Sequence, residues 1–305
     1  MIKIGIIGIG GVGGYIGAKL AQKRLAQVTF FARGEHFRAI KKDGLRIIDA
    51  DEEFTIKSKN LIDTDNDNSD EIFDIVFVCV KSYSFEKIAP IVSLHVNKNS
   101  LIIPLSNGVN HKVELNKLIS KGTVLDGCVY VLSNIKEYGV IEKKASVFYL
   151  VFGDYKNRFQ PKLQQLADIL NQSDLKSKLS RHIEFDCWVK YLLISSFATM
   201  TSYYDKPLGY IAKEKMSELK ETLDEIKSVA NAMGVDITEK EIAKTIKQIQ
   251  NVPYDSKTSM QIDFENSHKT ELESLTGYIV KNAKSLGLEV KNMKKMYEKL
   301  SNIPL

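Results

Sequence analysis

The stretch GIIGIGGVGGYIG, residues 5–17, contains three glycines with the spacing of a GxGxxG dinucleotide-binding turn. An apolar run precedes it and a helical pattern follows it, as a strand–turn–helix unit requires. In such a turn the first glycine permits a tight bend, the second lets a pyrophosphate approach the backbone, and the third lets the helix pack against its strand. Free N–H groups at the start of the helix then face the phosphates. We therefore predict that a dinucleotide binds at Gly8, Ile9, Gly10, Gly11, Val12 and Gly13.

The chain alternates strand and helix patterns in its first half and is helical in its second half. Strand-like apolar runs occupy 2–8, 27–33, 74–80 and 100–109, with helical patterns at 12–24 and 85–92. Residues 44–57 resemble an antiparallel pair, and residues 123–153 add further strand character. Helical periodicity dominates at 160–172, 186–204, 216–234 and 271–287. These patterns predict an α/β fold, with an N-terminal Rossmann-type doubly wound sheet (residues 1–170) and a C-terminal all-α domain (residues 171–305).

The composition favours an ordinary globular protein of the cytoplasm. Hydrophobic residues make up 44% of the 305 residues, and charged residues 27%. A net charge of +5, with no basic run interleaved with aromatic residues, argues against a nucleic-acid partner. The apolar runs are too short for a membrane span, and the first residues do not form a signal peptide. The three cysteines lack metal-binding spacing, so we expect no metal site.

The end of the second strand distinguishes between the two nicotinamide cofactors. NAD-binding proteins usually carry an acidic residue about 20 residues after the glycine turn, where it binds the ribose hydroxyls. This chain has Arg33 there, and an arginine makes a bidentate, charge-assisted contact with a 2′-phosphate. NADP(H) is therefore the predicted cofactor. Glu35 and His36 follow closely, so an acidic residue that binds the ribose hydroxyls is one alternative. A solvated arginine at a strand end is the other.

Two further polar residues follow predicted strands. Lys81 comes directly after FVCV, and Asn107 comes after IIPLS. Ligands of open α/β sheets bind at the carboxyl ends of the strands. Lys81 is placed to reach a phosphate or the adenosine, and Asn107 to hydrogen-bond the nicotinamide or the substrate. An exposed lysine and an ordinary Asn-Gly turn are the alternatives.

Lys190 and Glu271 are the candidate catalytic residues of the second half. Lys190 lies in the apolar segment CWVKYLLISSF, where burial would favour its neutral form and bring its pKa toward the range of an acid/base catalyst. A lysine that extends from a buried helix to solvent is the alternative. Glu271 begins a helical segment, and Ser259 precedes it in SKTSMQIDFE. Their carboxylate and hydroxyl would suit one small substrate, although from the sequence alone a solvated helix residue is the better default for Glu271.

Together these segments resemble the ketopantoate (2-dehydropantoate) reductase family over nearly the whole chain. The resemblance rests on GIGGVG, Arg33, CVKSY, SNGV, DCWVKYLL and SMQID followed by KTELESLTGYIV. It implies an NADP-dependent Rossmann domain, a helical domain, and the reduction of a 2-keto acid, 2-dehydropantoate, to pantoate for pantothenate biosynthesis. In this resemblance Lys190 is the catalytic lysine and general acid, and Asn107 is the asparagine on the cofactor side. Ser259 is implied as a substrate-binding serine and Glu271 as the acidic residue of the active site.

The chain departs from the family at two positions. The family often carries asparagines one and two helical turns after the lysine, where this chain has Ile194 and Ala198. Because these positions share the helix face of Lys190, that side of the substrate site is expected to be apolar. A β-hydroxyacid or sugar-acid dehydrogenase and a non-catalytic NADP(H)-binding sensor are the alternative functions. The amphipathic helices are also compatible with a homodimer.

Overall fold

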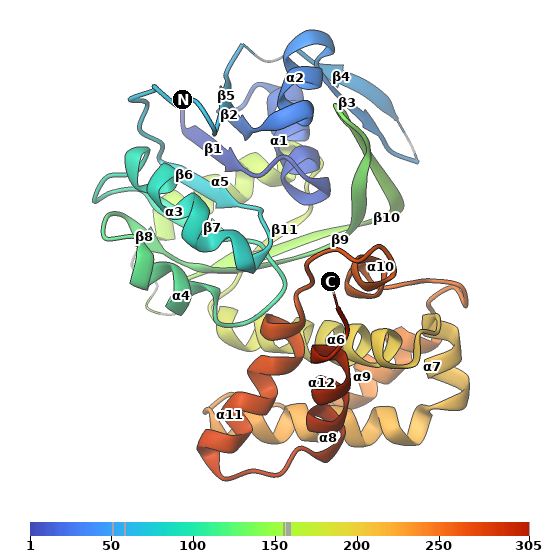
Figure 1. The fold of residues 1–305 in the computed structure, drawn as a ribbon. Coiled ribbons are helices and arrows are strands. Elements are labelled where there is room, and N and C mark those ends of the chain that lie inside the picture. The colour runs from blue at the N-terminus through green and yellow to red at the C-terminus, as the bar shows by residue number, and fades with distance from the viewer. Residues whose placement is uncertain (51, 58, 155, 157–159, 305) are drawn as a thin grey trace. The chain divides into compact units, whose positions relative to one another are not determined.

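The computed structural model describes residues 1–50, 52–57, 59–154, 156 and 160–304, which form two compact units (Figure 1). The first unit comprises Met1–Ser106 and Asn110–Ile183, and the second comprises Asn107–Val109 and Glu184–Leu305. The division after Ile183 differs from the expected boundary at residue 170. Helix α5 (Gln160–Gln172) packs into the core of the first unit, and strand β11 (Ser177–Leu179) pairs in parallel with β10 (Val140–Gly153).

The core of the first unit is a six-stranded parallel sheet in the order β5-β2-β1-β6-β7-β8. This order confirms the predicted Rossmann-type doubly wound sheet. The strands are β1 (Lys3–Ile7), β2 (Gln27–Ala32), β5 (Leu61–Asp63), β6 (Ile75–Val78), β7 (Leu101–Pro104) and β8 (Thr123–Val124). Neighbouring side chains of β1 enter opposite cores, Ile6 on one face and Ile7 on the other, which explains its continuous apolar sequence. The helices are α1 (Gly11–Lys23), α2 (Gly34–Asp43), α3 (Phe85–Leu94) and α4 (His111–Leu118).

A second sheet lies against α1 in the same unit. It contains β3 (Leu45–Ile48), β4 (Glu53–Ile56), β9 (Asp126–Glu137), β10 and β11. Strands β3 and β4 are antiparallel, as the sequence predicts, and β9 and β10 form a long antiparallel hairpin. Ile141 of β10 approaches Gly14 of α1 so closely that a Cβ on that glycine would lie 2.7 Å from it. The helix that follows the glycine turn is therefore enclosed by two sheets.

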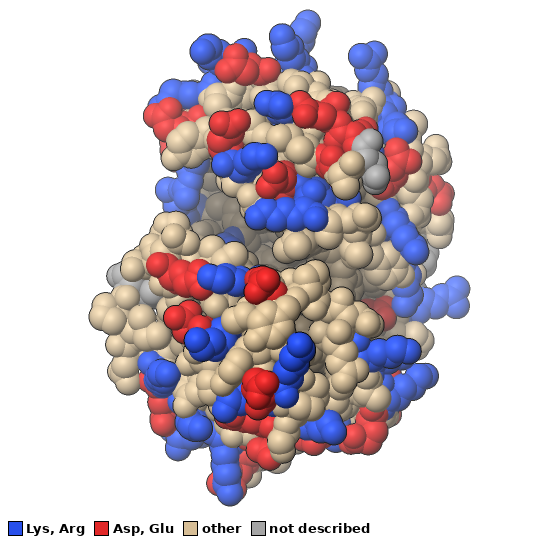
Figure 2. All heavy atoms as spheres, turned by 90° about the vertical axis from the view of Figure 1, so that its right-hand side faces the viewer, with Lys and Arg blue, Asp and Glu red and all other residues tan. Residues whose placement is uncertain are grey.

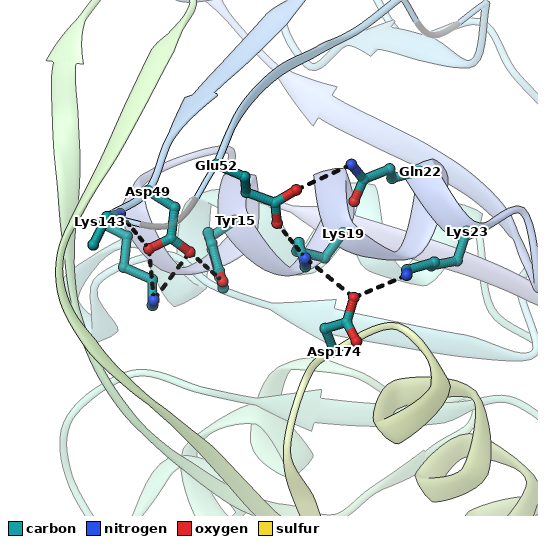
Figure 3. Close-up of polar contacts among 9 residues, drawn as sticks. Tyr15, Lys19, Gln22, Lys23, Asp49, Glu52, Lys143 and Asp174 are labelled. Carbon is teal, nitrogen blue, oxygen red and sulfur yellow. Dashed lines mark hydrogen bonds and ion pairs between the residues drawn. The ribbon is translucent and has the colours of Figure 1, made fainter.

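A buried polar network also ties α1 to this second sheet (Figure 3). The Tyr15 hydroxyl donates to Asp49 at 2.8 Å, and Lys143 Nζ donates to both Asp49 carboxylate oxygens at 2.8 and 3.0 Å. The Lys143 and Asp49 side chains are only 4% and 6% exposed. Further along the helix, Lys19 pairs with Glu52. Because buried charges require partners, the network fixes α1 against the β3–β4 connection.

The Asp49 network gives unfolding a predictable pH dependence. Burial by itself would raise the pKa of Asp49, but the hydrogen bonds from Lys143 and Tyr15 outweigh burial and lower it. Because the pKa of Asp49 is lower in the folded than in the unfolded protein, its ionised form stabilises the fold at a pH above the unfolded-state pKa of about 3.9. This stabilisation is lost as the pH falls through the folded-state pKa. We expect Lys143→Met to be less stable than the wild type at pH 7, and the difference to shrink at pH 3.

Urea unfolding of both proteins at pH 7 and pH 3 measures this difference. The control is Lys23→Met, because Lys23 pairs with Asp174 at an exposed site and surface pairs contribute about 0–1 kcal/mol. A gap between Lys143→Met and wild type that stays constant over this pH range would contradict the role given to Asp49.

The second unit is helical, as predicted. Its helices are α6 (Ile183–Tyr204), α7 (Leu208–Glu214), α8 (Met216–Ala232), α9 (Glu239–Gln250), α10 (Ser259–Glu265), α11 (Tyr278–Leu286) and α12 (Lys291–Ser301), with a π-helix at Glu273–Gly277. Apolar side chains from each of these α-helices contribute to its core. In the part of the chain that the structure describes, every helix is too short or too polar to cross a membrane. Lysines and arginines alternate with acidic residues over the face shown in Figure 2.

Candidate active site

The glycine turn has the geometry that a phosphate-bearing cofactor requires. Gly8 has φ +94°, a conformation that favours glycine. A Cβ on Gly13 would lie 2.2 Å from the Gly8 carbonyl oxygen, so only glycine allows α1 to pack this close to β1. A Cβ on Gly10, in contrast, would meet nothing within 4 Å. The backbone at Gly10 is therefore open to approach by a ligand.

The first turn of α1 completes this cradle. Gly10 is the N-cap of α1 and has no side chain to satisfy the N–H groups of the first turn, which are left for an anion. Gly11 lies against the backbone of Ser133, and a Cβ there would be 2.3 Å from the Ser133 carbonyl oxygen. Ile9 is buried in the core, and Val12 packs against it. These residues fit a dinucleotide.

Arg33 lies at the carboxyl end of β2, where the sequence predicts it. It is the exposed N-cap residue of α2 and makes no capping hydrogen bond with its side chain. The two neighbours that favoured an acidic site have other partners. Glu35 pairs with Arg38, and this hydrogen bond lowers the pKa of Glu35. His36 Nδ1 accepts a hydrogen bond from the Gly139 N–H at 3.0 Å. A contact between Arg33 and the cofactor ribose stays a prediction.

Lys81 also lies at a carboxyl strand end of the first unit. It follows β6 and is the N-cap of a short 3₁₀-helix, Ser82–Ser84. Its side chain is partly buried. Since β6 is the direct neighbour of β1, Lys81 and the glycine turn follow adjacent strands.

The structure brings Lys190, Asn107 and Glu271 together in the second unit. Lys190 Nζ donates to Asn107 Oδ1 at 2.9 Å, and Asn107 Nδ2 donates to Glu271 Oε2 at 3.4 Å. Lys190 is 8% exposed and Glu271 only 2% exposed. The Asn107 amide thus connects a buried ammonium group to a buried carboxylate. Such a charged, hydrogen-bonded chain is suited to holding a proton donor in place beside a small substrate.

Glu271 is followed by an unusual backbone segment. Leu275 N–H donates to the Glu271 carbonyl oxygen at 3.0 Å, and residues Glu273–Gly277 form the π-helix. Two hydroxyl groups of α6, on Tyr191 and Ser195, hydrogen-bond to carbonyl oxygens of this π-helix. π-Helical turns are often found at functional sites. Sequence patterns did not identify these two hydroxyls, because tyrosine and serine in an apolar helix match ordinary core positions.

Ser259 begins helix α10, next to a residue that contacts α6. It is the exposed first residue of α10, whose N-cap Thr258 shares a 2.9 Å hydrogen bond with Thr201. Since α6 rises about 1.5 Å per residue, Thr201 is about 16 Å along the helix axis from Lys190. Helix α10 thus contacts α6 eleven residues after Lys190, and the role of Ser259 in substrate binding stays a prediction.

The two apolar positions after Lys190 differ in exposure. Ile194 is partly buried and packs against the helical core, whereas Ala198 is 1% exposed and belongs to that core. Ala198 is therefore a packing residue, and Ile194 is the more accessible of the two.

Comparison with known proteins establishes the family. The model of "Ketopantoate reductase PanE/ApbA" matches residues 4–157, and that of "Ketopantoate reductase PanE/ApbA C terminal" matches residues 182–303. The chain belongs to the ketopantoate reductase family. The family is one of oxidoreductases, and the resemblance inferred from the sequence motifs is confirmed.

Relatives in the ketopantoate reductase family cover nearly the whole chain. An uncharacterized oxidoreductase, YkpB, of Bacillus subtilis (strain 168) is 31% identical over 98% of both chains. The 2-dehydropantoate 2-reductase of Archaeoglobus fulgidus is 27% identical over 94% of this chain and 92% of its own. The solved 2-dehydropantoate 2-reductase of Porphyromonas gingivalis W83 is 27% identical, with a TM-score of 0.86 over 99% of both chains.

Two solved structures of lower identity share the ketopantoate reductase fold. A D-mandelate dehydrogenase with NADH and anilino(oxo)acetate has a TM-score of 0.90 at 19% identity, covering 98% of this chain and 97% of its own. A dimeric ketopantoate reductase of Staphylococcus aureus has a TM-score of 0.81 at 20% identity over 98% of both chains. The NADH belongs to the D-mandelate dehydrogenase structure, and the glycine turn of this chain fits a dinucleotide. A homodimer and a cytoplasmic location stay predictions for this chain.

Proposed function

We propose that this protein is an NADPH-dependent reductase that converts a 2-keto acid to a 2-hydroxy acid, with ketopantoate as the first candidate substrate and pantoate as the product. The observation that supports this proposal best is the hydrogen bond from Lys190 Nζ to Asn107 Oδ1, beside the Glu271 carboxylate. The chain's membership of the ketopantoate reductase family agrees with it.

The chemistry assigns one task to each member of the trio. A nicotinamide cofactor held at the glycine turn would supply the hydride for the keto carbon, and the carbonyl electron pair would move onto oxygen. Lys190 donates a hydrogen bond to that oxygen and transfers a proton to the developing alkoxide. Asn107 orients the ammonium group by accepting one of its hydrogen bonds. Glu271 orients the Asn107 amide or binds a hydroxyl group of the substrate.

One set of assays tests the proposed reaction. NADPH and NADH oxidation would be followed with ketopantoate, 2-ketoisovalerate and other 2-keto acids, and D-mandelate oxidation would be followed in the reverse direction. We expect turnover of at least one 2-keto acid with NADPH. Cofactor binding without turnover of any acid would contradict the proposal and support a non-catalytic sensor. Oxidation of 3-hydroxy or sugar acids in place of 2-hydroxy acids would support the alternative dehydrogenase.

Arg33→Ala is expected to reduce the preference for NADPH over NADH. The loss of charge-assisted hydrogen bonds to a 2′-phosphate should raise the KM for NADPH about tenfold and leave that for NADH nearly unchanged. Arg38→Ala is the control, because Arg38 lies five residues later, within α2, and pairs with Glu35. Equal wild-type kcat/KM values for the two cofactors would refute the role given to Arg33.

Ile194→Asn is expected to raise the selectivity for ketopantoate over 2-ketoisovalerate. The new amide lies one turn after Lys190 and offers a hydrogen bond that only the hydroxyl-bearing acid can use. One such bond corresponds to about a tenfold change in the ratio of kcat/KM values. Leu193→Asn adds the same amide at a partly buried position on another face of α6. An unchanged ratio in Ile194→Asn would show that position 194 does not contact the substrate.

A further inference from the structure

The π-helix Glu273–Gly277 is held by hydroxyl groups of a distant helix. The Tyr191 hydroxyl lies 3.0 Å from the Ser274 carbonyl oxygen and 2.6 Å from the Leu275 carbonyl oxygen. The Ser195 hydroxyl donates to the same Leu275 oxygen at 2.8 Å. A π-helix departs from the α-helical hydrogen-bond pattern, and buried carbonyl groups require partners. Two side chains of α6 thus supply donors to the altered segment.

These hydroxyls lie on the helix that carries Lys190, while the carbonyls they bind belong to the turn that follows Glu271. Tyr191 is the residue directly after Lys190, and it is 1% exposed. The Ser274 hydroxyl donates to the Glu271 carbonyl oxygen at 3.1 Å, and Leu275 N–H donates to that oxygen as well. Ser274 and Leu275 therefore accept hydrogen bonds from α6 through their carbonyl oxygens and donate hydrogen bonds to the carbonyl oxygen of Glu271.

We propose that Tyr191 and Ser195 are positioning residues that fix Glu271 relative to Lys190 through the π-helix. The inference rests on the proposed reductase function, because it gives these hydroxyls an effect on the Lys190–Asn107–Glu271 chain. Holding reacting groups in one geometry has a large effect on rate, and a misplacement of 1 Å costs up to about a hundredfold.

The same two segments provide a matched control. Thr199 and Thr276 share a buried hydroxyl–hydroxyl hydrogen bond of 2.7 Å, one turn further along α6. Thr199→Val removes a buried hydroxyl between these segments but leaves the Ser274 and Leu275 carbonyl contacts intact. A purely structural role for Tyr191 and Ser195 predicts that their loss and the loss of the Thr199 hydroxyl have similar consequences.

The experiment compares Tyr191→Phe/Ser195→Ala with Thr199→Val in the full-length protein. We expect the double variant to lower kcat for 2-keto acid reduction about ten- to hundredfold, with the KM for NADPH unchanged. Thr199→Val should keep kcat within about twofold of wild type. Hydrogen exchange of backbone amides 271–277 should be faster in the double variant than in Thr199→Val. Thermal unfolding confirms that each variant is folded, and Ser195→Ala alone replaces the double variant if that protein does not fold.

The outcomes separate this inference from the proposed function. If the wild type is active, two results would overturn the positioning role and leave the reductase function intact. One is a double variant with wild-type kcat. The other is a Thr199→Val variant that loses as much kcat as the double variant does. If the wild type reduces no 2-keto acid, the proposed function fails. The exchange of backbone amides 271–277 is then the only test of whether Tyr191 and Ser195 hold the π-helix. Unchanged exchange at 271–277 in the double variant would overturn the inference in that case, and faster exchange would support it.

Discussion

Lys190→Met should lower kcat for 2-keto acid reduction by about 10²–10⁴-fold and leave the affinity for NADPH unchanged. A positioned general acid typically contributes a rate factor of this size. Methionine keeps most of the length of the side chain but removes the ammonium group that Asn107 binds. The proposed phosphate contacts, at the glycine turn and Arg33, lie in the first unit, so binding of NADPH, measured by fluorescence titration, should be retained.

Lys190→Arg distinguishes proton transfer from charge alone. Arginine keeps a positive charge and donates hydrogen bonds, but it does not give up its proton in proteins. If Lys190 acts as a general acid, the arginine variant should lose most of its kcat as well. A methionine variant with wild-type kcat would remove Lys190 from the mechanism, and an arginine variant with wild-type kcat would reduce its role to electrostatic stabilisation.

Gly10→Ala should weaken NADPH binding about tenfold or more without destabilising the fold. Gly10 has φ −87° and ψ −164°, which alanine adopts readily, and its Cβ would meet no protein atom within 4 Å. The methyl group would instead occupy the space over which a pyrophosphate approaches the backbone. Loss of charge-assisted hydrogen bonds to the phosphates accounts for the expected size of the effect.

Gly13→Ala is the matched control, and it should lower the free energy of unfolding because of a clash within the protein. Its Cβ would lie 2.2 Å from the Gly8 carbonyl oxygen, so the helix must move away from the strand. Strain of this kind typically costs about 1–3 kcal/mol in the free energy of unfolding. Thermal unfolding without cofactor and titration with NADPH separate the two variants. A Gly10→Ala protein that binds NADPH like wild type would show that no phosphate approaches this glycine.

Local sequence patterns predicted the fold where short-range rules determine structure. The glycine turn, the parallel strands around β1 and the long helix α6 follow from apolar runs, glycine spacing and periodicity. Strand β11 was missed because it has three residues and is defined by its pairing with β10. The first unit extends to Ile183, past the expected boundary at residue 170, since β11 belongs to its second sheet.

Motifs identified the residues of the candidate site but did not reveal how they are connected. The resemblance to a family named Lys190, Asn107 and Glu271, and the structure adds the hydrogen bonds through the Asn107 amide. The π-helix could not be predicted, because its carbonyl partners come from α6, far away in the sequence. Ala198, expected on the substrate side, is 1% exposed and belongs to the core of the helical unit, and no pattern within α6 indicates this burial.

Asn107–Val109 belongs to the helical unit, although the chain on both sides of it belongs to the sheet unit. Dissection of the protein therefore cannot follow a single cut. A fragment that starts at Glu184 would contain Lys190 and Glu271 but lack the amide that joins them. In a chimera that joins the sheet half of one relative to the helical half of another, this asparagine would likewise come from a different protein than Lys190 and Glu271. The Lys190–Asn107–Glu271 trio is therefore discontinuous in the sequence, and shuffling experiments need to transfer the short segment Asn107–Val109 together with the helical half.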